Sequence, residues 1–200
     1  LPVLTTSSDS TICEGDTIQI EVFGGNSFNW LTANNISNST VSNPQIWPNT
    51  TTTYRVLAAD TNTCADTAEI TINVNPKPTV NAGLDQDVCL GDSTLLNASG
   101  NAVSYSWNNG ILDGVLFQSV STQDYILYGT DLNNCNNQDT VTINSLSLPI
   151  IDAGQDERIC IGDSVQLLVT GANNYLWTPN NDINNNTISN PFVYPTIPTE

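Results

Sequence analysis

The 200-residue sequence contains no histidine and no methionine, and its three basic residues stand against 20 acidic ones. Without histidine it lacks the commonest general base and metal ligand, so Ser-His and Cys-His nucleophile systems cannot be built. The formal net charge of −17 repels phosphate backbones and anionic lipid, so no nucleic-acid partner is expected. No apolar run reaches the roughly 18 residues of a spanning helix, so no membrane insertion is expected.

A Cys-x-Gly-Asp-Ser/Thr motif occurs three times, at residues 13–17, 89–93 and 160–164. Each copy is followed by a tryptophan: Trp30, Trp107 and Trp177. The first two copies continue with a tyrosine-bearing strand, a second cysteine and a closing segment of alternating polarity. Landmarks in one fixed order indicate internal repeats. The predicted domains are residues 1–76, 77–147 and 148–200, joined by short proline-marked linkers.

The pattern within each repeat favours strands. Residues 17–22 alternate with the period of two that a half-buried strand shows, and no segment has a convincing helical period. Roughly seven short strands in each repeat fit a small antiparallel β-sandwich, which makes the chain an all-β linear array of tandem domains. The repeated tryptophan is predicted to anchor each core rather than to stack on a ligand.

The third repeat, residues 148–200, is predicted to be incomplete. Its Asn190-Pro191 aligns with Asn43-Pro44, so its last two strands and second cysteine are missing from the sequence. The favoured interpretation is that the sequence is a segment of a longer protein. The start at Leu1 lacks the features of a signal peptide. The alternative is that a strand from the next subunit completes the sandwich.

The five cysteines follow the repeat. The predicted disulfides are Cys13–Cys64 and Cys89–Cys135, with the partner of Cys160 outside the sequence. Each disulfide would close a loop and stabilise the folded state by roughly 4 kcal/mol on the chain-entropy model. Reduction is therefore expected to lower the melting temperature by tens of degrees. Oxidised pairs imply an extracytoplasmic compartment. The alternative is a set of unpaired, buried thiols.

The sequence resembles the Ig-like (PKD-like) tandem repeats of giant surface proteins in Bacteroidetes-type bacteria. These proteins are exported by type IX secretion and include gliding-motility adhesins. The resemblance lies in residues 81–85, 152–156, 160–164, 175–179 and 189–191. It implies Ig-like domains in an extracellular array, on the bacterial cell surface or in a secreted filament, with neighbouring copies or repeats of the same protein as partners in a fibre.

The resemblance also implies O-linked glycans at Asp-Ser/Thr followed by a small or aliphatic residue, which would make the chain a glycoprotein. The six candidate attachment residues are Ser10, Thr17, Thr67, Ser93, Thr140 and Ser164. The alternative interpretation is structural, because an aspartate at the start of a strand accepts backbone hydrogen bonds and caps the turn.

Acidic residues near the predicted domain junctions form a candidate calcium site, because carboxylates are the hard oxygen ligands that Ca²⁺ prefers. The candidates are Asp85, Asp87, Asp152 and Asp156. The alternative is a solvated acidic loop, and no other cofactor is expected.

The function predicted is therefore a non-enzymatic structural repeat of an extracellular fibre or adhesin stalk. No catalytic residue is assigned, since an active site is normally built once and these motifs recur. The runner-up is a module that binds carbohydrate or a surface through an exposed aromatic side chain, with Trp47 as the candidate ligand residue. Packing of Trp47 at an edge beside Pro48 is the structural alternative.

Overall fold

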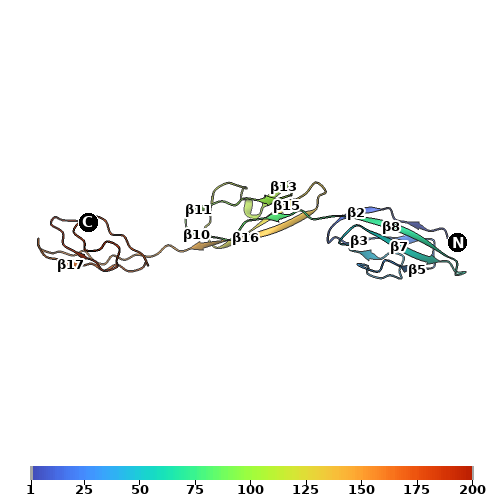
Figure 1. Ribbon diagram of the computed structural model, residues 1–200, viewed down its shortest axis with the longest axis horizontal. Helices are drawn as coiled ribbons and strands as arrows, with labels where there is room; N and C mark the ends of the chain where they lie inside the picture. Colours follow the sequence, from blue (N-terminus) through green and yellow to red (C-terminus); the bar gives the residue numbers. More distant parts are fainter. Residues whose placement is uncertain (1, 200) are drawn as a thin grey trace. The chain divides into compact units, whose positions relative to one another are not determined.

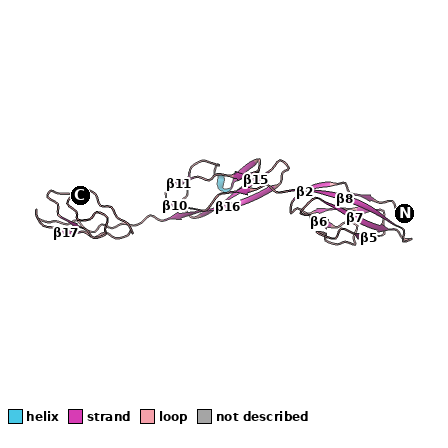
Figure 2. Ribbon diagram, viewed as in Figure 1, coloured by secondary structure: helices cyan, strands magenta, loops and turns pink. Residues whose placement is uncertain are grey.

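The computed structural model describes residues 2–199 (Figure 1). Within these residues the regular structure is all β, apart from one 3-10 turn, η1, at Asn108–Gly110. Figure 2 shows strands of unequal length connected by irregular segments. Leu1–Ser145 form one compact unit and Leu146–Glu200 a second. The first unit contains two sandwiches, which we call sandwich 1 (β1–β8) and sandwich 2 (β9–β16).

Sandwich 1 packs a four-stranded sheet against two short strand pairs. The sheet has the order β2-β8-β7-β5, in which β2 runs parallel to β8 and the other neighbours are antiparallel. The pairs are β1–β4 and β3–β6. The strands are β1 (Thr5–Thr6), β2 (Ser10–Cys13), β3 (Ile18–Gln19), β4 (Val22–Phe23), β5 (Ser27–Trp30), β6 (Gln45–Ile46), β7 (Thr52–Ala59) and β8 (Ala65–Asn75).

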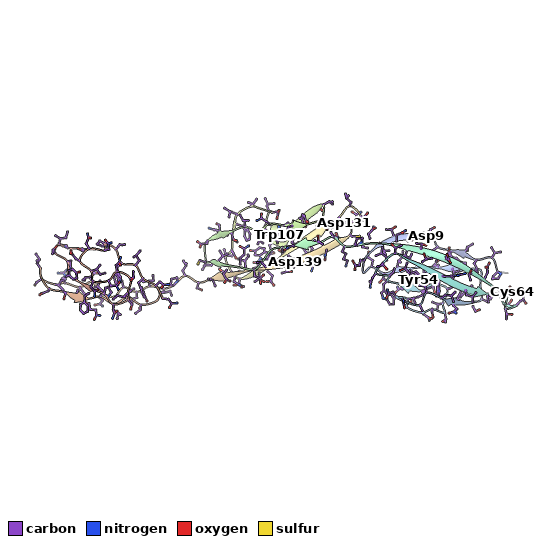
Figure 3. The ribbon with its side chains drawn as sticks, in the orientation of Figure 1. Asp9, Tyr54, Cys64, Trp107, Asp131 and Asp139 are labelled. Atoms are coloured by element: carbon purple, nitrogen blue, oxygen red, sulfur yellow. A yellow bond between two sulfur atoms is a disulfide. The ribbon has the colours of Figure 1, made fainter. Side chains whose placement is uncertain are left out.

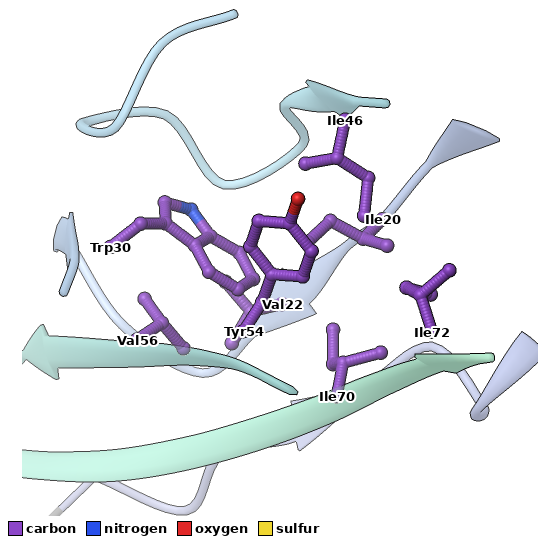
Figure 4. Close-up of a cluster of buried hydrophobic side chains, with 8 residues drawn as sticks. All are labelled: Ile20, Val22, Trp30, Ile46, Tyr54, Val56, Ile70 and Ile72. Carbon is purple, nitrogen blue, oxygen red and sulfur yellow. The ribbon is translucent and has the colours of Figure 1, made fainter. Parts of the chain in front are cut away.

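The core of sandwich 1 lies between these layers (Figure 4). Side chains that alternate along β7 and β8 point inward, as a half-buried strand requires, and meet those of the opposite layer. The fully buried members are Ile20, Val22, Trp30, Ile46, Tyr54, Val56, Ile70 and Ile72. Trp30 is 1% exposed, and its Nε1 donates to the Val41 carbonyl at 2.9 Å. The predicted role of this tryptophan as a core anchor is confirmed.

The topology of sandwich 1 is Ig-like. Strands β5, β7 and β8 correspond to C, F and G of the immunoglobulin fold, with the buried tryptophan on C. Tyr54 lies near the start of the F strand, two residues before Val56, which takes the place of the second cysteine of antibody domains. Buried aliphatic packing therefore replaces the usual inter-sheet disulfide.

Sandwich 2 repeats this architecture. Its main sheet has the order β10-β16-β15-β13, and the short pairs are β9–β12 and β11–β14. Trp107 is 8% exposed and its Nε1 donates to Asp113 Oδ1 at 3.1 Å. The strands are β9 (Val80–Asn81), β10 (Gln86–Cys89), β11 (Ser93–Thr94), β12 (Ser99–Gly100), β13 (Ser104–Trp107), β14 (Phe117–Gln118), β15 (Gln123–Thr130) and β16 (Asn136–Leu146).

The second unit contains the pairings of the front half of a sandwich. Strands β17 (Val165–Gln166) and β18 (Phe192–Val193) are antiparallel, and an isolated bridge joins Asp152 to Thr170. The Nε1 of Trp177 donates to the Ile188 carbonyl at 2.9 Å, as Trp30 does to Val41. The fold class predicted from the sequence, all-β tandem Ig-like sandwiches, is confirmed.

One glycine has the same structural role in all three repeats. A Cβ built on Gly24 would lie 2.0 Å from the Val3 carbonyl oxygen, and one on Gly100 would lie 2.1 Å from that of Thr79. In the second unit, a Cβ on Gly171 would lie 1.8 Å from the Ile150 oxygen. Two backbone segments therefore approach too closely for a side chain at this position, which explains the recurrence of glycine here.

Candidate functional site: the junction between the two sandwiches

The first side of the junction is the Cys-x-Gly-Asp turn that follows β2. Cys13 ends that strand, and Asp16 closes the turn by donating its backbone amide to the Cys13 carbonyl at 3.0 Å. The Asp16 carboxylate in turn accepts the Cys13 amide at 3.2 Å. Gly15 has a φ of +83°, a left-handed backbone that glycine adopts without steric cost. The motif is thus a tight turn that fixes the direction of the Cys13 side chain.

The second side is the turn between β15 and β16. Asp131 Oδ1 accepts the amides of Asn133 and Cys135, both at 2.8 Å, and the Asp131 amide donates to the Cys135 carbonyl at 3.0 Å. Asn134 has a φ of +62°, a conformation that asparagine tolerates. The aspartate carboxylate therefore organises the turn that presents Cys135.

A disulfide between Cys13 and Cys135 joins the two turns. The Cα atoms are 5.5 Å apart, and 122 residues separate the two cysteines in the sequence. Cys135 is fully buried and Cys13 is half-buried. The bond links sandwich 1 to sandwich 2 and closes no loop within either of them.

Hydrogen bonds hold the intervening linker at both ends. On the side of sandwich 1, the Glu14 amide donates to the Asn75 carbonyl at 2.9 Å. On the side of sandwich 2, Asn137 Nδ2 donates to the carbonyl of the buried Pro78 at 2.8 Å, and the Thr79 amide donates to Asn101 Oδ1 at 2.6 Å. The linker thus runs between two anchored ends, beside a covalent bond that spans the same junction.

The predicted pairs Cys13–Cys64 and Cys89–Cys135 are wrong. Cys13 lies opposite Asn75 in the parallel β2–β8 ladder, whereas Cys64 immediately precedes the other end of β8. An 11-residue strand at about 3.3 Å per residue places these ends roughly 35 Å apart. Cys64, Cys89 and Cys160 are exposed, free thiols. The alternative prediction, unpaired buried thiols, is also wrong for these three.

Sequence reasoning missed Asp60 and Asp131. Both begin the pattern Asp-x-Asn-x-Cys, at residues 60–64 and 131–135. Asp60 Oδ1 accepts the amides of Asn62 and Cys64 at 2.8 and 3.0 Å, so the turn around Cys64 is built like the one around Cys135. The recurrence of this second motif was the signal that could have identified both aspartates.

The candidate glycosylation residues are accessible. Thr17, Thr67, Ser93, Thr140 and Ser164 are exposed and Ser10 is half-buried. Several of the aspartates that precede them bind backbone amides: Asp9 accepts that of Thr71 at 2.8 Å, and Asp139 that of Ala82 at 2.8 Å. These contacts give the aspartates a structural role whether or not the neighbouring hydroxyl carries sugar.

Three of the four calcium candidates accept hydrogen bonds within their own unit. Asp85 accepts the Thr142 amide at 2.8 Å, which repeats the Asp9 contact in sandwich 1, and Asp87 accepts Asn144 Nδ2 at 2.9 Å. In the second unit, Asp152 caps its own turn through the Gly154 amide at 2.9 Å, and Asp156 is exposed. No group of three or more His, Cys, Asp or Glu side chains within residues 2–199 could hold a metal ion.

Trp47 follows β6 on the surface of sandwich 1 and is 39% exposed, next to the buried Pro48. Its amide donates to the Asn35 carbonyl at 3.0 Å. Tyr194 follows β18 in the same way, is 46% exposed, and its amide donates to the Asp182 carbonyl at 2.8 Å. An exposed aromatic side chain therefore occupies one equivalent position in two repeats.

No protein-family model and no curated protein matches the sequence. Solved structures of tandem Ig domains match at low similarity. The insect immune protein hemolin is 14% identical with a TM-score of 0.41, and the match covers 72% of this chain and 47% of hemolin.

Two further structures of tandem Ig domains give similar values. The first eight Ig domains of Down Syndrome Cell Adhesion Molecule match at 14% identity and a TM-score of 0.38, over 99% of this chain and 38% of that one. Ig domains 1–4 of Sidekick-1 match at 13% identity and a TM-score of 0.35, over 96% of this chain and 67% of that one. The match covers less than half of the solved chains of hemolin and Down Syndrome Cell Adhesion Molecule. No helix within the described part of the chain is long and apolar enough to cross a membrane.

Proposed function

We propose that this chain is a non-enzymatic structural segment of an extracellular fibre or adhesin stalk on a bacterial surface. The proposal rests on the Cys13–Cys135 bond, which joins successive sandwiches. A disulfide within a domain would serve stability alone. A bond between domains, beside a linker that is hydrogen-bonded at both ends, limits bending and transmits tension from one domain to the next.

The supporting chemistry agrees with this role. Disulfides persist in oxidising compartments, so a bonded junction favours a location outside the cytoplasm. The net charge of −17 keeps a long exposed array soluble and disfavours collapse between neighbouring segments. Export by a type IX route belongs to the same proposal and rests on the sequence resemblance.

Immunogold electron microscopy of intact, unpermeabilised cells of the source bacterium, with an antibody raised against residues 1–145, tests the location. We expect gold along filaments or a surface layer. Labelling that appears only after permeabilisation would place the chain inside the cell and overturn the proposal. Cells with the coding segment deleted are the control.

Junction stiffness is tested separately by small-angle X-ray scattering on the 200-residue chain, with and without the Cys135→Ser substitution. We expect the substitution to broaden the distribution of distances between the two sandwiches, because the linker alone then joins them. An unchanged distribution would show that the bond has no mechanical role. Cys160→Ser is the matched control, since Cys160 is a free, exposed thiol.

Glycan attachment is a further part of the proposal. The five exposed candidate hydroxyls and the half-buried Ser10 are open or partly open to modification, and sugar would shield the short strand edges from pairing with other chains. Intact-mass spectrometry of the native chain is the measurement. A mass equal to that of the bare polypeptide would remove this part of the proposal and leave the structural role unaffected.

A carbohydrate- or surface-binding module is the second candidate function. The equivalent, exposed positions of Trp47 and Tyr194 favour it, because aromatic faces commonly provide the apolar surface for sugar rings. A glycan array with the native chain and the Trp47→Ala variant tests it. Specific binding that is lost in the variant would support this role, and no binding by the native chain would exclude it.

A further inference from the structure

The bonded junction uses two different turns, and each of them recurs unpaired elsewhere in the chain. Cys13 belongs to a Cys-x-Gly-Asp turn and Cys135 to an Asp-x-Asn-x-Cys turn. Cys64 lies in a second Asp-x-Asn-x-Cys turn, at the β7–β8 connection of sandwich 1 (Figure 3). Cys89 ends β10 in a second Cys-x-Gly-Asp turn. The chain therefore contains one joined pair of turns and further unjoined halves of both types.

The turns that contain Cys64 and Cys89 have the same backbone hydrogen bonds as the turns of the bonded cysteines. The Asp60 amide donates to the Cys64 carbonyl at 2.9 Å, and the Asp131 amide to the Cys135 carbonyl at 3.0 Å. The Asp92 amide donates to the Cys89 carbonyl at 2.9 Å, as the Asp16 amide does to that of Cys13 at 3.0 Å. The cysteines differ in exposure, because Cys135 is buried and Cys13 half-buried while Cys64 and Cys89 are exposed.

The bonded pair also defines the direction of the connection. The Cys-x-Gly-Asp cysteine of one sandwich binds the Asp-x-Asn-x-Cys cysteine of the sandwich that follows it in the chain. Applied to the next junctions, this rule leaves Cys64 open toward a preceding sandwich and Cys89 open toward a following one. Both thiols are free in the structure, and the rule does not pair them with each other within one chain, because sandwich 2 follows sandwich 1 and Cys64 requires a preceding partner.

We propose that Cys64 and Cys89 form further inter-domain disulfides of the Cys13–Cys135 kind, with a second repeat of this protein as the partner. Cys64 binds a Cys-x-Gly-Asp cysteine, and Cys89 binds an Asp-x-Asn-x-Cys cysteine. This inference rests on the proposed structural function and deepens it. Each complete repeat then bonds to the preceding repeat through its Asp-x-Asn-x-Cys turn and to the following repeat through its Cys-x-Gly-Asp turn. The result is a disulfide at every junction between successive repeats of the array.

Bond formation needs an oxidant, and a small disulfide such as oxidised glutathione supplies it. The thiolate of Cys64 attacks one glutathione sulfur and releases one glutathione thiolate. The thiolate of the partner cysteine then attacks the Cys64 sulfur and releases the second. The two protein thiols lose two electrons and two protons, and glutathione disulfide is reduced to two glutathione thiols.

The test is pairing selectivity between copies of the 200-residue chain. Each copy supplies one Asp-x-Asn-x-Cys thiol, Cys64, and two Cys-x-Gly-Asp thiols, Cys89 and Cys160. The concentrated chain is equilibrated in a glutathione redox buffer that leaves Cys13–Cys135 intact, and intermolecular disulfides are quantified by peptide mapping. We expect unlike pairs, Cys64–Cys89 and Cys64–Cys160, to exceed the like pairs Cys64–Cys64 and Cys89–Cys89 several-fold.

Substitutions sharpen the result. Cys64→Ser should abolish nearly all linked species, whereas Cys160→Ser should leave the Cys64–Cys89 product. Like and unlike pairs in comparable amounts, or Cys64 recovered only as its glutathione adduct, would overturn the inference. Since cell-surface labelling and junction stiffness are measured independently, a failure of pairing selectivity is distinguishable from a failure of the proposed function.

Discussion

Thr63 and Asn134 occupy the same place in the two Asp-x-Asn-x-Cys turns, and both have a left-handed backbone, with φ of +64° and +62°. Asparagine tolerates this region, but a β-branched threonine is strained there by about 1–3 kcal/mol. We expect Thr63→Asn to raise the free energy of unfolding of sandwich 1 by about 1 kcal/mol in urea titrations. Asn134→Thr, the reverse change in sandwich 2, should lower stability by a similar amount. A loss of stability in Thr63→Asn would contradict the argument.

Tyr54 links stability to alkaline pH. Burial raises the pKa of its hydroxyl above the ordinary value of 10.0. The unfolded chain therefore releases this proton at about pH 10 while the folded chain retains it, so the free energy of unfolding of sandwich 1 falls as pH rises above 10. Tyr54→Phe should remove this part of the pH dependence in urea titrations between about pH 9 and 11.

The same variant has a separate cost at neutral pH. The Tyr54 hydroxyl donates to the carbonyls of Asn34 and Asn35 at 3.3 and 3.4 Å, long bonds whose loss should cost about 1 kcal/mol or less. Tyr128→Phe is the control, because Tyr128 is exposed on sandwich 2. An alkaline slope in Tyr54→Phe as steep as in the native chain would assign the effect to another group.

At the residue level, sequence patterns identified the core more reliably than the site. The repeated tryptophan was predicted to anchor each core, and Trp30 and Trp107 are buried whereas Trp177 is half-buried. Asp85 was a calcium candidate because carboxylates gather near it in the sequence, and the structure shows that its Oδ1 accepts the Thr142 amide. A pattern shows that a carboxylate is present, but only the register of neighbouring strands shows which amide it meets.

At the level of elements, the close contact between β9 and β12 depends on Gly100. Gly100→Ala would bring a methyl group to 2.1 Å from the Thr79 carbonyl oxygen and strain a φ of +134°. We expect sandwich 2 to lose more than about 2 kcal/mol of stability in urea titrations, because the backbone must move. Gly83→Ala is the matched control, since Gly83 has a φ of +90° with nothing within 4 Å of the added methyl. Equal losses in both variants would mean that the close approach contributes nothing.

The direction of β2 explains why the disulfides could not be predicted. The alternating pattern showed that strands were present, and the repeat showed which cysteines were equivalent. Neither indicated that β2 runs parallel to β8, which places Cys13 beside Asn75 and far from Cys64. Cysteine spacing within a repeat therefore could not distinguish a bond inside a domain from a bond between domains.

At the scale of the whole molecule, one disulfide stabilises two sandwiches. If sandwich 1 unfolds while sandwich 2 stays folded, the bond and the anchored Pro78 close a loop of roughly 60 residues in the unfolded segment. If sandwich 2 unfolds instead, the bond and Asn75 close a loop of similar length. Each event is disfavoured by about 4 kcal/mol on the chain-entropy model, although neither sandwich contains a disulfide of its own.

Cys135→Ser is therefore expected to lower the melting temperature of both sandwiches, by about 15 °C or more, although the substitution lies in only one of them. Differential scanning calorimetry, with NMR signals from each sandwich to assign the transitions, is the measurement. Cys13→Ser should reproduce the effect, and the double variant should add nothing further, because both substitutions remove the same bond. Destabilisation confined to the sandwich that carries the substitution would show that local packing around the sulfur, and not the closed loop, provides the stability.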